Sequence, residues 1–300
     1  MNTGRIMLET SLRIIGIIFP LFACTLLGTW YCKRFKPDLT AVNRLNLDVF
    51  SPLLIFWALV DKPFDPVGYL NLAVGGAVVI LGSGLLLLPL VLLSRINLHT
   101  FLPPMMFNNS GNMGLPLLLF AFGPEALQPA VILLIVGMLL QFTVGVLLLD
   151  HRVNPLKMLR NPILLAAVIG LVMNITGIRL PEPVMATINM LGQVAIPLLL
   201  FALGARLLDV DMKDWQLGTF GAFAGPLVGV ASALAIMPFL HLSEFESAIL
   251  IVFGALPPAV FNLLLAEQYQ QEPHRVASLV LIGNLFSVII IPVALWFTLP

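Results

Sequence analysis

Ten apolar segments of membrane-spanning length occupy most of the chain, and they limit the folds that it can adopt. A helix needs about 20 mostly apolar residues to cross a bilayer. The segments cover residues 12–31, 44–60, 69–93, 100–122, 127–149, 161–178, 186–206, 215–240, 244–266 and 275–298. Charged residues make up only 10% of the chain, against about 25% in soluble proteins. The sequence therefore predicts an all-α polytopic membrane protein with short connections.

Lys and Arg are distributed unevenly between the two sides that these segments define. Eleven of the fifteen lie at the connections after the first, third, fifth, seventh and ninth segments, and four lie on the opposite side. Because cytoplasmic loops carry the excess of Lys and Arg, both termini of this multi-pass protein are predicted outside the cytoplasm. The formal net charge is zero, so no basic surface is expected to bind nucleic acid.

The two halves of the chain share residues at a nearly constant spacing. The sequence FSPLLIF at 50–56 lies 145 residues before AIPLLLF at 195–201. At an offset of 146, Phe107 corresponds to Phe253, and the three leucines at 117–119 correspond to the three leucines at 263–265. The spacing indicates a duplication.

Each half holds five predicted spans, an odd number, so the second copy must enter the membrane from the opposite face. The expected organisation is a first five-helix repeat over residues 1–150 and a second, inverted five-helix repeat over residues 151–300.

The fourth and ninth spans are interrupted by helix-breaking residues at corresponding places. The fourth contains FNNSGNMGLP at 107–116, and the ninth contains GALPPAVFN at 254–262. Proline and glycine weaken a helix interior, and backbone groups freed in lipid must be satisfied by protein or water. Paired broken helices therefore indicate a transport site near the middle of the membrane. Half-helix N-termini at the breaks offer unpaired N–H groups that suit an anion.

The sequence NSGNMGLP at 109–116 resembles the broken-helix motif of the auxin efflux carrier family of membrane transporters. The residues at 43–45 and the Leu-Pro-Pro sequence at 256–258 are similar to that family too. The resemblance implies ten helices in an inverted-repeat fold shared with the bile acid–sodium symporters, with helices 4 and 9 broken and crossing. Spans 1, 2, 6 and 7 would form a scaffold, and spans 3–5 and 8–10 a moving transport unit.

The same resemblance implies the substrate class. Family members carry carboxylates, which are auxins in plants and small dicarboxylates such as malonate and malate in some bacterial members. The short loops of this chain resemble the bacterial type, which implies a location in the bacterial inner (cell) membrane. Family precedent implies a homodimer.

Polar side chains cluster in the interrupted part of the fourth span. Three amides and a hydroxyl within five positions exceed what helix–helix hydrogen bonding needs, although such a bonding patch is the alternative. Asn112 is the favoured ligand because it lies between two glycines, and the family resemblance points to the same residue. The expected substrate-binding residues are Asn108, Asn109, Ser110, Gly111, Asn112, Gly114, Pro116, Pro257, Pro258 and Asn262.

Five other residues are secondary candidates. Gln141, Gln193 and Asn284 are single amides in apolar spans, which favours interhelical hydrogen bonds over substrate contact. Pro52 and Pro197 favour bends in scaffold helices over substrate contact.

The ionisable residues give little indication of which ion is coupled to transport. No acidic residue lies centrally in a predicted span, and Asp48 and Glu267, near span ends, are expected beside water. No cofactor, no metal and no buried cation for the substrate are expected. H⁺ and Na⁺ both stay open as the coupling ion, since sodium could use backbone carbonyls and amides at the breaks.

These observations together predict a secondary active transporter of a small organic anion, a mono- or dicarboxylate, working by alternating access at the crossed broken helices. A sodium-coupled organic anion symporter of the bile-acid type and a channel are the alternatives. An intramembrane enzyme is disfavoured because the chain has no HExxH sequence.

Overall fold

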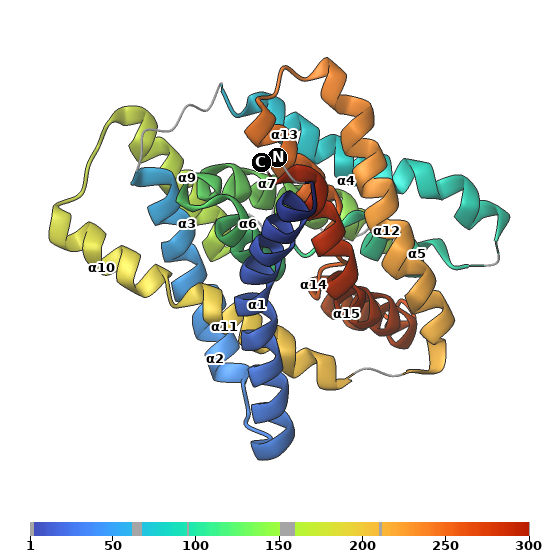
Figure 1. Cartoon of the computed structure of the whole chain (residues 1–300). Helices are drawn as coiled ribbons and strands as arrows, with labels where there is room; N and C mark the ends of the chain where they lie inside the picture. Colours follow the sequence, from blue (N-terminus) through green and yellow to red (C-terminus); the bar gives the residue numbers. More distant parts are fainter. Residues whose placement is uncertain (1–2, 62–67, 95, 151–159, 210–211, 300) are drawn as a thin grey trace.

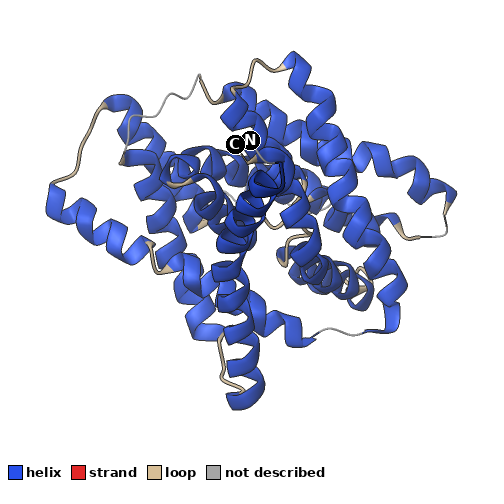
Figure 2. Cartoon of the chain, in the orientation of Figure 1, coloured by secondary structure: helices blue, strands red, loops and turns tan. Residues whose placement is uncertain are grey.

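The computed structural model describes residues 3–61, 68–94, 96–150, 160–209 and 212–299, and the regular elements in these ranges are helices (Figures 1 and 2). Six stretches of this part of the chain are long and apolar enough to cross a membrane. They are Met7–Phe35, Leu70–Leu93, Pro124–Leu149, Glu182–Arg206, Trp215–Phe239 and Pro273–Thr298. The chain is therefore a multi-pass integral membrane protein.

Every apolar segment predicted from the sequence is occupied by one helix or by consecutive helices. The first half contains α1 (Thr3–Phe35), α2 (Thr40–Leu45), η1 (Asn46–Phe50), α3 (Ser51–Val60), α4 (Leu70–Leu93), α5 (Leu98–Met106), η2 (Ser110–Gly114), α6 (Leu115–Phe122), η3 (Pro124–Ala126), α7 (Leu127–Leu140), η4 (Gln141–Gly145) and α8 (Val146–Leu149). The second half contains α9 (Pro162–Thr176), α10 (Glu182–Gly192), α11 (Ala195–Arg206), η6 (Leu207–Asp209), η7 (Met212–Asp214), α12 (Trp215–Ile236), η8 (Met237–Phe239), α13 (Glu244–Gly254), α14 (Phe261–Gln268) and α15 (Pro273–Thr298).

The four segments outside the six long stretches hold short or interrupted helices. A π-helical turn, η1, separates α2 from α3, and α9 has 15 residues. Irregular chain at 107–109 separates α5 from η2, and irregular chain at 255–260 separates α13 from α14. These are the two interruptions that the sequence predicts in its fourth and ninth spans.

The helices form two groups that meet along the middle of the molecule. In one group α1 packs on α11, and α3 packs on α9 and α10. In the other, α4 packs on α5, α7 and α12, while α12 packs on α13 and α15 (Figure 1). Contacts of α1 with α6 and α15, and of α3 with α7, join the groups. The broken helices belong to the second group and face the first.

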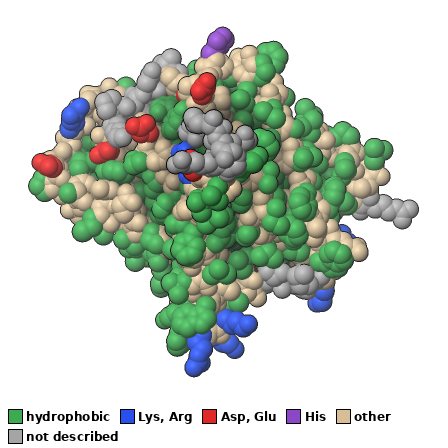
Figure 3. Space-filling view, viewed as in Figure 1, with side chains coloured by type: hydrophobic (Ala, Val, Ile, Leu, Met, Phe, Trp, Pro, Cys, Tyr) green, Lys and Arg blue, Asp and Glu red, His purple; other side chains and the backbone are tan. Residues whose placement is uncertain are grey.

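Charged side chains concentrate at two opposite ends of the surface seen in Figure 3. Lys and Arg gather at the bottom of the view, below the end of α1, and several Asp and Glu side chains lie near the top. Hydrophobic side chains cover much of the surface between these ends. This division matches a protein whose middle faces lipid and whose ends face water.

Close backbone contact between α1 and α11 depends on two glycines. A Cβ atom at Gly28 would collide with the carbonyl of Phe201, and one at Gly204 would collide with the carbonyl of Thr25. The hydroxyl of Thr29 uses the same proximity, because it donates to the carbonyl oxygen of Gly204 at 2.8 Å. Small residues allow helix backbones to approach in this way inside a membrane.

Replacing Gly28 by alanine is therefore expected to destabilise the fold by about 1–3 kcal/mol, the usual cost of inserting atoms into a packed interface. The matched control on the same helix is Gly16→Ala, because no atom lies within 4 Å of a Cβ added at Gly16. Thermal unfolding of both purified variants in detergent measures the difference. Equal melting temperatures for the two variants would contradict the packing described here.

Candidate functional site

The two broken helices cross by pairing their irregular backbones. The N–H of Asn109 donates to the carbonyl oxygen of Pro257 at 2.7 Å, and the N–H of Ala259 donates to that of Phe107 at 2.9 Å. Together the bonds form an antiparallel bridge between the two breaks. Each break thus supplies partners to the other, as non-helical backbone at membrane depth requires.

Two asparagine side chains extend this pairing to the ends of the half-helices. The side-chain amide of Asn108 donates to the carbonyl oxygen of Phe253 at 2.6 Å. The side-chain amide of Asn262 donates to the carbonyl oxygen of Phe107 at 2.9 Å. Both acceptors lie at the C-terminal end of a half-helix, where carbonyls lose their helical partners. These two asparagines therefore stabilise the crossing.

A buried amide network connects the crossing to neighbouring helices. Asn109 donates through Nδ2 to Oδ1 of Asn284 at 2.8 Å, and Asn284 donates to the carbonyl oxygen of Pro258 at 2.9 Å. Gln141 donates through Nε2 to Oδ1 of Asn262 at 2.9 Å. Asn109, Asn262 and Asn284 are each 3% exposed and Gln141 is 7% exposed, so the network fixes both breaks against η4 and α15.

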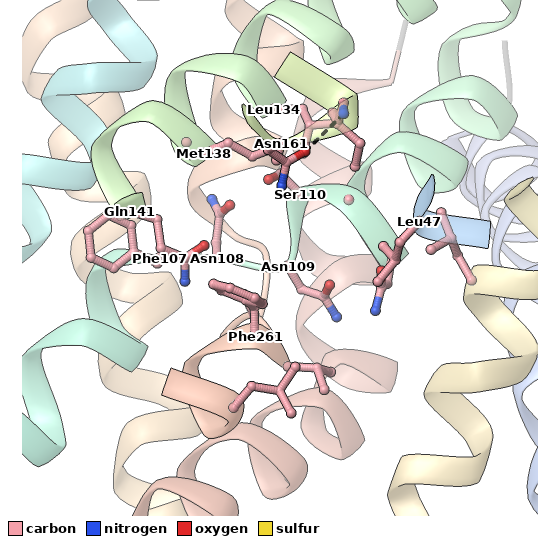
Figure 4. A pocket seen from close by; sticks show the side chains of 18 of the residues that line it. Leu47, Phe107, Asn108, Asn109, Ser110, Leu134, Met138, Gln141, Asn161 and Phe261 are labelled. Carbon is pink, nitrogen blue, oxygen red and sulfur yellow. Dashed lines mark hydrogen bonds between the residues drawn. The ribbon is translucent and has the colours of Figure 1, made fainter. Parts of the chain in front are cut away.

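A cavity of about 350 Å³ lies beside the crossing, between the two groups of helices (Figure 4). Its wall is polar around the break of the fourth span and apolar around Phe142 and Phe261, whose rings meet edge to face with centroids 5.4 Å apart. The residues that line it are Asn43, Asn46, Leu47, Asp48, Ile80, Phe107, Asn108, Asn109, Ser110, Gly111, Asn112, Leu134, Gly137, Met138, Gln141, Phe142, Asn161, Pro162, Ile163, Leu199, Ala202, Arg206, Ala259, Val260, Phe261 and Leu264.

Some polar groups on this wall have no hydrogen-bond partner among the described residues. They include the hydroxyl of Ser110, the side-chain amide of Asn112 and the backbone N–H groups of Gly111 and Asn112. Ser110 is 9% exposed, so its hydroxyl lies inside the protein and not on the outer surface. These donors belong to residues that line the cavity, at the start of the half-helix formed by η2 and α6, where they can bind a ligand.

The structure places only part of the predicted site on the cavity. Of the substrate-binding candidates, Asn108, Asn109, Ser110, Gly111 and Asn112 line it, and of the secondary candidates Gln141 does. Gly114, Pro116, Pro257, Pro258, Asn262, Asn284, Gln193, Pro52 and Pro197 lie outside its lining. Gly114 instead permits close packing, because a Cβ there would lie 2.6 Å from a methyl group of Leu256. Gln193 is exposed and donates to Asn189 at 3.2 Å.

The prolines have structural positions of their own. Pro52 is the second residue of α3 and Pro116 the second residue of α6, and each of these helices follows directly after a π-helical turn. Pro197 is exposed within α11. The carbonyls of Pro257 and Pro258 accept hydrogen bonds from Asn109 and Asn284.

Sequence reasoning missed one wall of the cavity, formed by Asn43, Asn46, Asn161 and Arg206. No buried cation is expected for the substrate from the sequence, and the structure places the half-buried Arg206 on the lining of the same cavity as Asn112. Leu199, Ala202 and Arg206 are spaced to share one helix face, but this spacing does not predict which part of the protein that face meets.

The acidic residues near the span ends lie in contact with water. Asp48 lines the cavity and its carboxylate is 3.4 Å from the guanidinium of Arg44, with both side chains largely exposed. Glu267 is exposed. No group of His, Cys, Asp and Glu in the described ranges is arranged to hold a metal ion.

The Asn109–Asn284 bond predicts energetic coupling between these two residues. Asn109→Ala and Asn284→Ala should each destabilise the protein, and a double-mutant cycle should give a coupling of about 0.6 and at most about 1.7 kcal/mol, as for hydrogen bonds between membrane helices. Thermal unfolding in detergent measures it. Asn109→Ala combined with Gln193→Ala is the control and should give additive effects. Additivity in both pairs would contradict the network.

Comparison with known proteins agrees with a membrane transporter. A family model described as membrane transport protein matches residues 151–295. An uncharacterized transporter of Methanocaldococcus jannaschii is 27% identical over 207 residues, which are 64% of this chain and 65% of the relative. The chain thus matches a little under two thirds of that relative's length. The similarity to this family of membrane transport proteins covers residues 151–295, slightly less than half of the chain.

Proposed function

We propose that the protein is a secondary active transporter of a small organic anion, a mono- or dicarboxylate, which binds in the cavity beside the crossed broken helices. The observation that carries this proposal is the set of free donors at the first break. The N–H groups of Gly111 and Asn112, the amide of Asn112 and the hydroxyl of Ser110 face one cavity without partners in the described chain. Donors at a helix N-terminus, where the dipole is positive, favour an anion.

The second break adds to the same site. Val260 and Phe261, at the start of α14, line the cavity, and their N–H groups have no backbone acceptor outside the helix among the described residues. Two half-helix N-termini therefore converge on one space. A carboxylate placed there would replace the hydrogen bonds that water would otherwise supply.

The contacts between helices support an inverted repeat of residues 1–150 and 151–300. Contacts of the first span with the seventh (α1 with α11) have a counterpart in those of the sixth with the second (α9 with α3). Exchanging the halves also converts the contacts of α4 with α5 and α7 into those of α12 with α13 and α15. On this basis the chain has ten spans, four of them short or interrupted.

The position of the cavity supports alternating access. Asn112 and Gln141 belong to the proposed transport unit, whereas Asn46, Asn161 and Arg206 belong to the proposed scaffold. A site between two rigid bodies changes its accessible side when one moves against the other.

The orientation proposed from the charges places the scaffold wall of the cavity toward the cytoplasm. Asn46, Asn161 and Arg206 lie next to the connections that carry most of the Lys and Arg residues. We place the protein in the inner (cell) membrane with both termini outside. We also propose that the protein is a homodimer and that transport is coupled to H⁺ or Na⁺.

Uptake by the purified protein in proteoliposomes tests the transport function directly. Labelled malonate, malate and an indole acetate are offered separately, with a membrane potential, a pH gradient or a sodium gradient imposed one at a time. Saturable uptake of an acid is the expected result, and the gradient that drives it identifies the coupling ion. Uptake that rises linearly with concentration would favour a channel, and no uptake under any gradient would overturn the carboxylate proposal.

Asn112→Ala tests the site within the same assay. Losing one hydrogen bond to a charged ligand should raise KM or lower kcat/KM by about tenfold or more. The matched control, Asn189→Ala, removes the same side chain from α10, where it lies outside the cavity lining. If Asn112→Ala transports with the kinetics of the control, the anion binds elsewhere.

A further inference from the structure

The cavity carries two charged side chains, one of each sign. The carboxylate of Asp48 already lies 3.4 Å from the guanidinium of Arg44. Arg206 has neither an ion pair nor a hydrogen bond with any residue that the structure describes, and its side chain is half-buried on the cavity wall. Arg206 is therefore a positive charge on the described wall that forms no ion pair there, while the carboxylate of Asp48 is paired with Arg44.

The packing of α11 fixes the direction of Arg206. Gly204 lies against the backbone of α1 at Thr25, and the hydroxyl of Thr29 donates to the Gly204 carbonyl at 2.8 Å. With this face of α11 held against α1, the face that carries Leu199, Ala202 and Arg206 points into the cavity. The side chain thus extends from a rigid element, which favours a defined binding geometry.

The same wall contains a buried polar group without a partner. Asn46 lines the cavity at 3% exposure, and its Oδ1 accepts no hydrogen bond from the described residues. Asn161 also lines the wall, and its side chain caps the start of α9 by accepting from the N–H of Ile163 at 2.9 Å. With Asn43, Asn46, Asn161 and Arg206, this wall of the cavity carries several polar side chains.

We propose that Arg206 is the counter-charge that selects anions, and that its guanidinium pairs with a carboxylate of the transported substrate from the scaffold side. This inference rests on the proposed transport function and adds a specificity-determining residue to it. The donors of the broken helices also favour a carboxylate over its neutral amide, but they carry no full charge. The guanidinium adds a full positive charge, and a bond in which both partners are ionised increases the preference for the acid.

The test compares a transported acid with its neutral amide as unlabelled competitors of uptake. The wild type should prefer the acid, and Arg206→Gln should reduce that preference by about tenfold or more while raising KM for the acid. Arg206→Lys should keep most of the preference, since it keeps the charge. Arg34→Gln removes a positive charge from an exposed position at the end of α1, outside the cavity lining, and should leave the preference unchanged.

Chemical rescue separates charge recognition from a structural role. Arg206→Cys is treated with a thiol reagent that adds an ammonium group, or with one that adds a neutral methyl group of the same chemistry. Recovery of the acid preference with the first reagent only supports the inference. The wild type, which keeps Cys24 and Cys32, receives the same treatments as the control.

The outcomes of this experiment and of the uptake assay are distinct. Uptake by the wild type together with an unchanged acid preference in Arg206→Gln would overturn the role of Arg206 and leave the transport function standing. Equal effects of the two reagents on Arg206→Cys would overturn it too. Failure of the wild type to transport any acid would instead overturn the proposed function.

Discussion

Backbone hydrogen bonding at the crossing of the two broken helices is the constraint on which the site depends. A helix that breaks inside a membrane frees N–H and C=O groups, and each costs free energy unless it finds a partner. Here the N–H of Asn109 bonds to Pro257 and that of Ala259 bonds to Phe107, so each break supplies what the other lacks. Asn108 and Asn262 then satisfy the carbonyls at the ends of the half-helices. What remains unpaired, the N–H groups of the following turn, faces the cavity.

This pairing separates residues that look alike in the sequence. Asn108, Asn109 and Asn112 lie within five positions, yet the first two donate to protein acceptors and the third has no partner in the described chain. Whether such an asparagine stabilises the protein or binds a ligand depends on which acceptor the opposite helix brings near it. A substitution at Asn109 should therefore affect folding, whereas one at Asn112 should affect substrate affinity with little change in stability.

The helical segments and both breaks could be predicted from the sequence, because apolar length, proline and glycine act locally. The amide partners could not, since Asn284 lies 175 residues from Asn109 and meets it only after the halves pack. The omission of Arg206 has a similar cause. At the end of a predicted span it looks like one of the cytoplasmic charges, and only the packing of Gly204 against α1 directs it to the cavity. Placement of Gln193 and Pro197 off the site likewise depends on the rotation of α10 and α11.

If Arg206 pairs with the substrate, the two groups of helices contribute different parts of the binding site. Uncharged donors on the broken helices would move with the anion, whereas the positive charge would stay on the scaffold. A ligand shifts a conformational equilibrium only by its difference in affinity for the two states. Arg206 would bind the anion while the cavity faces it and lose the anion as the transport unit moves away. The charge would then make the affinity for the anion higher in the state whose cavity contains Arg206. Transport of the anion away from that side would break this contact, and the coupling gradient would have to supply the free energy that is lost.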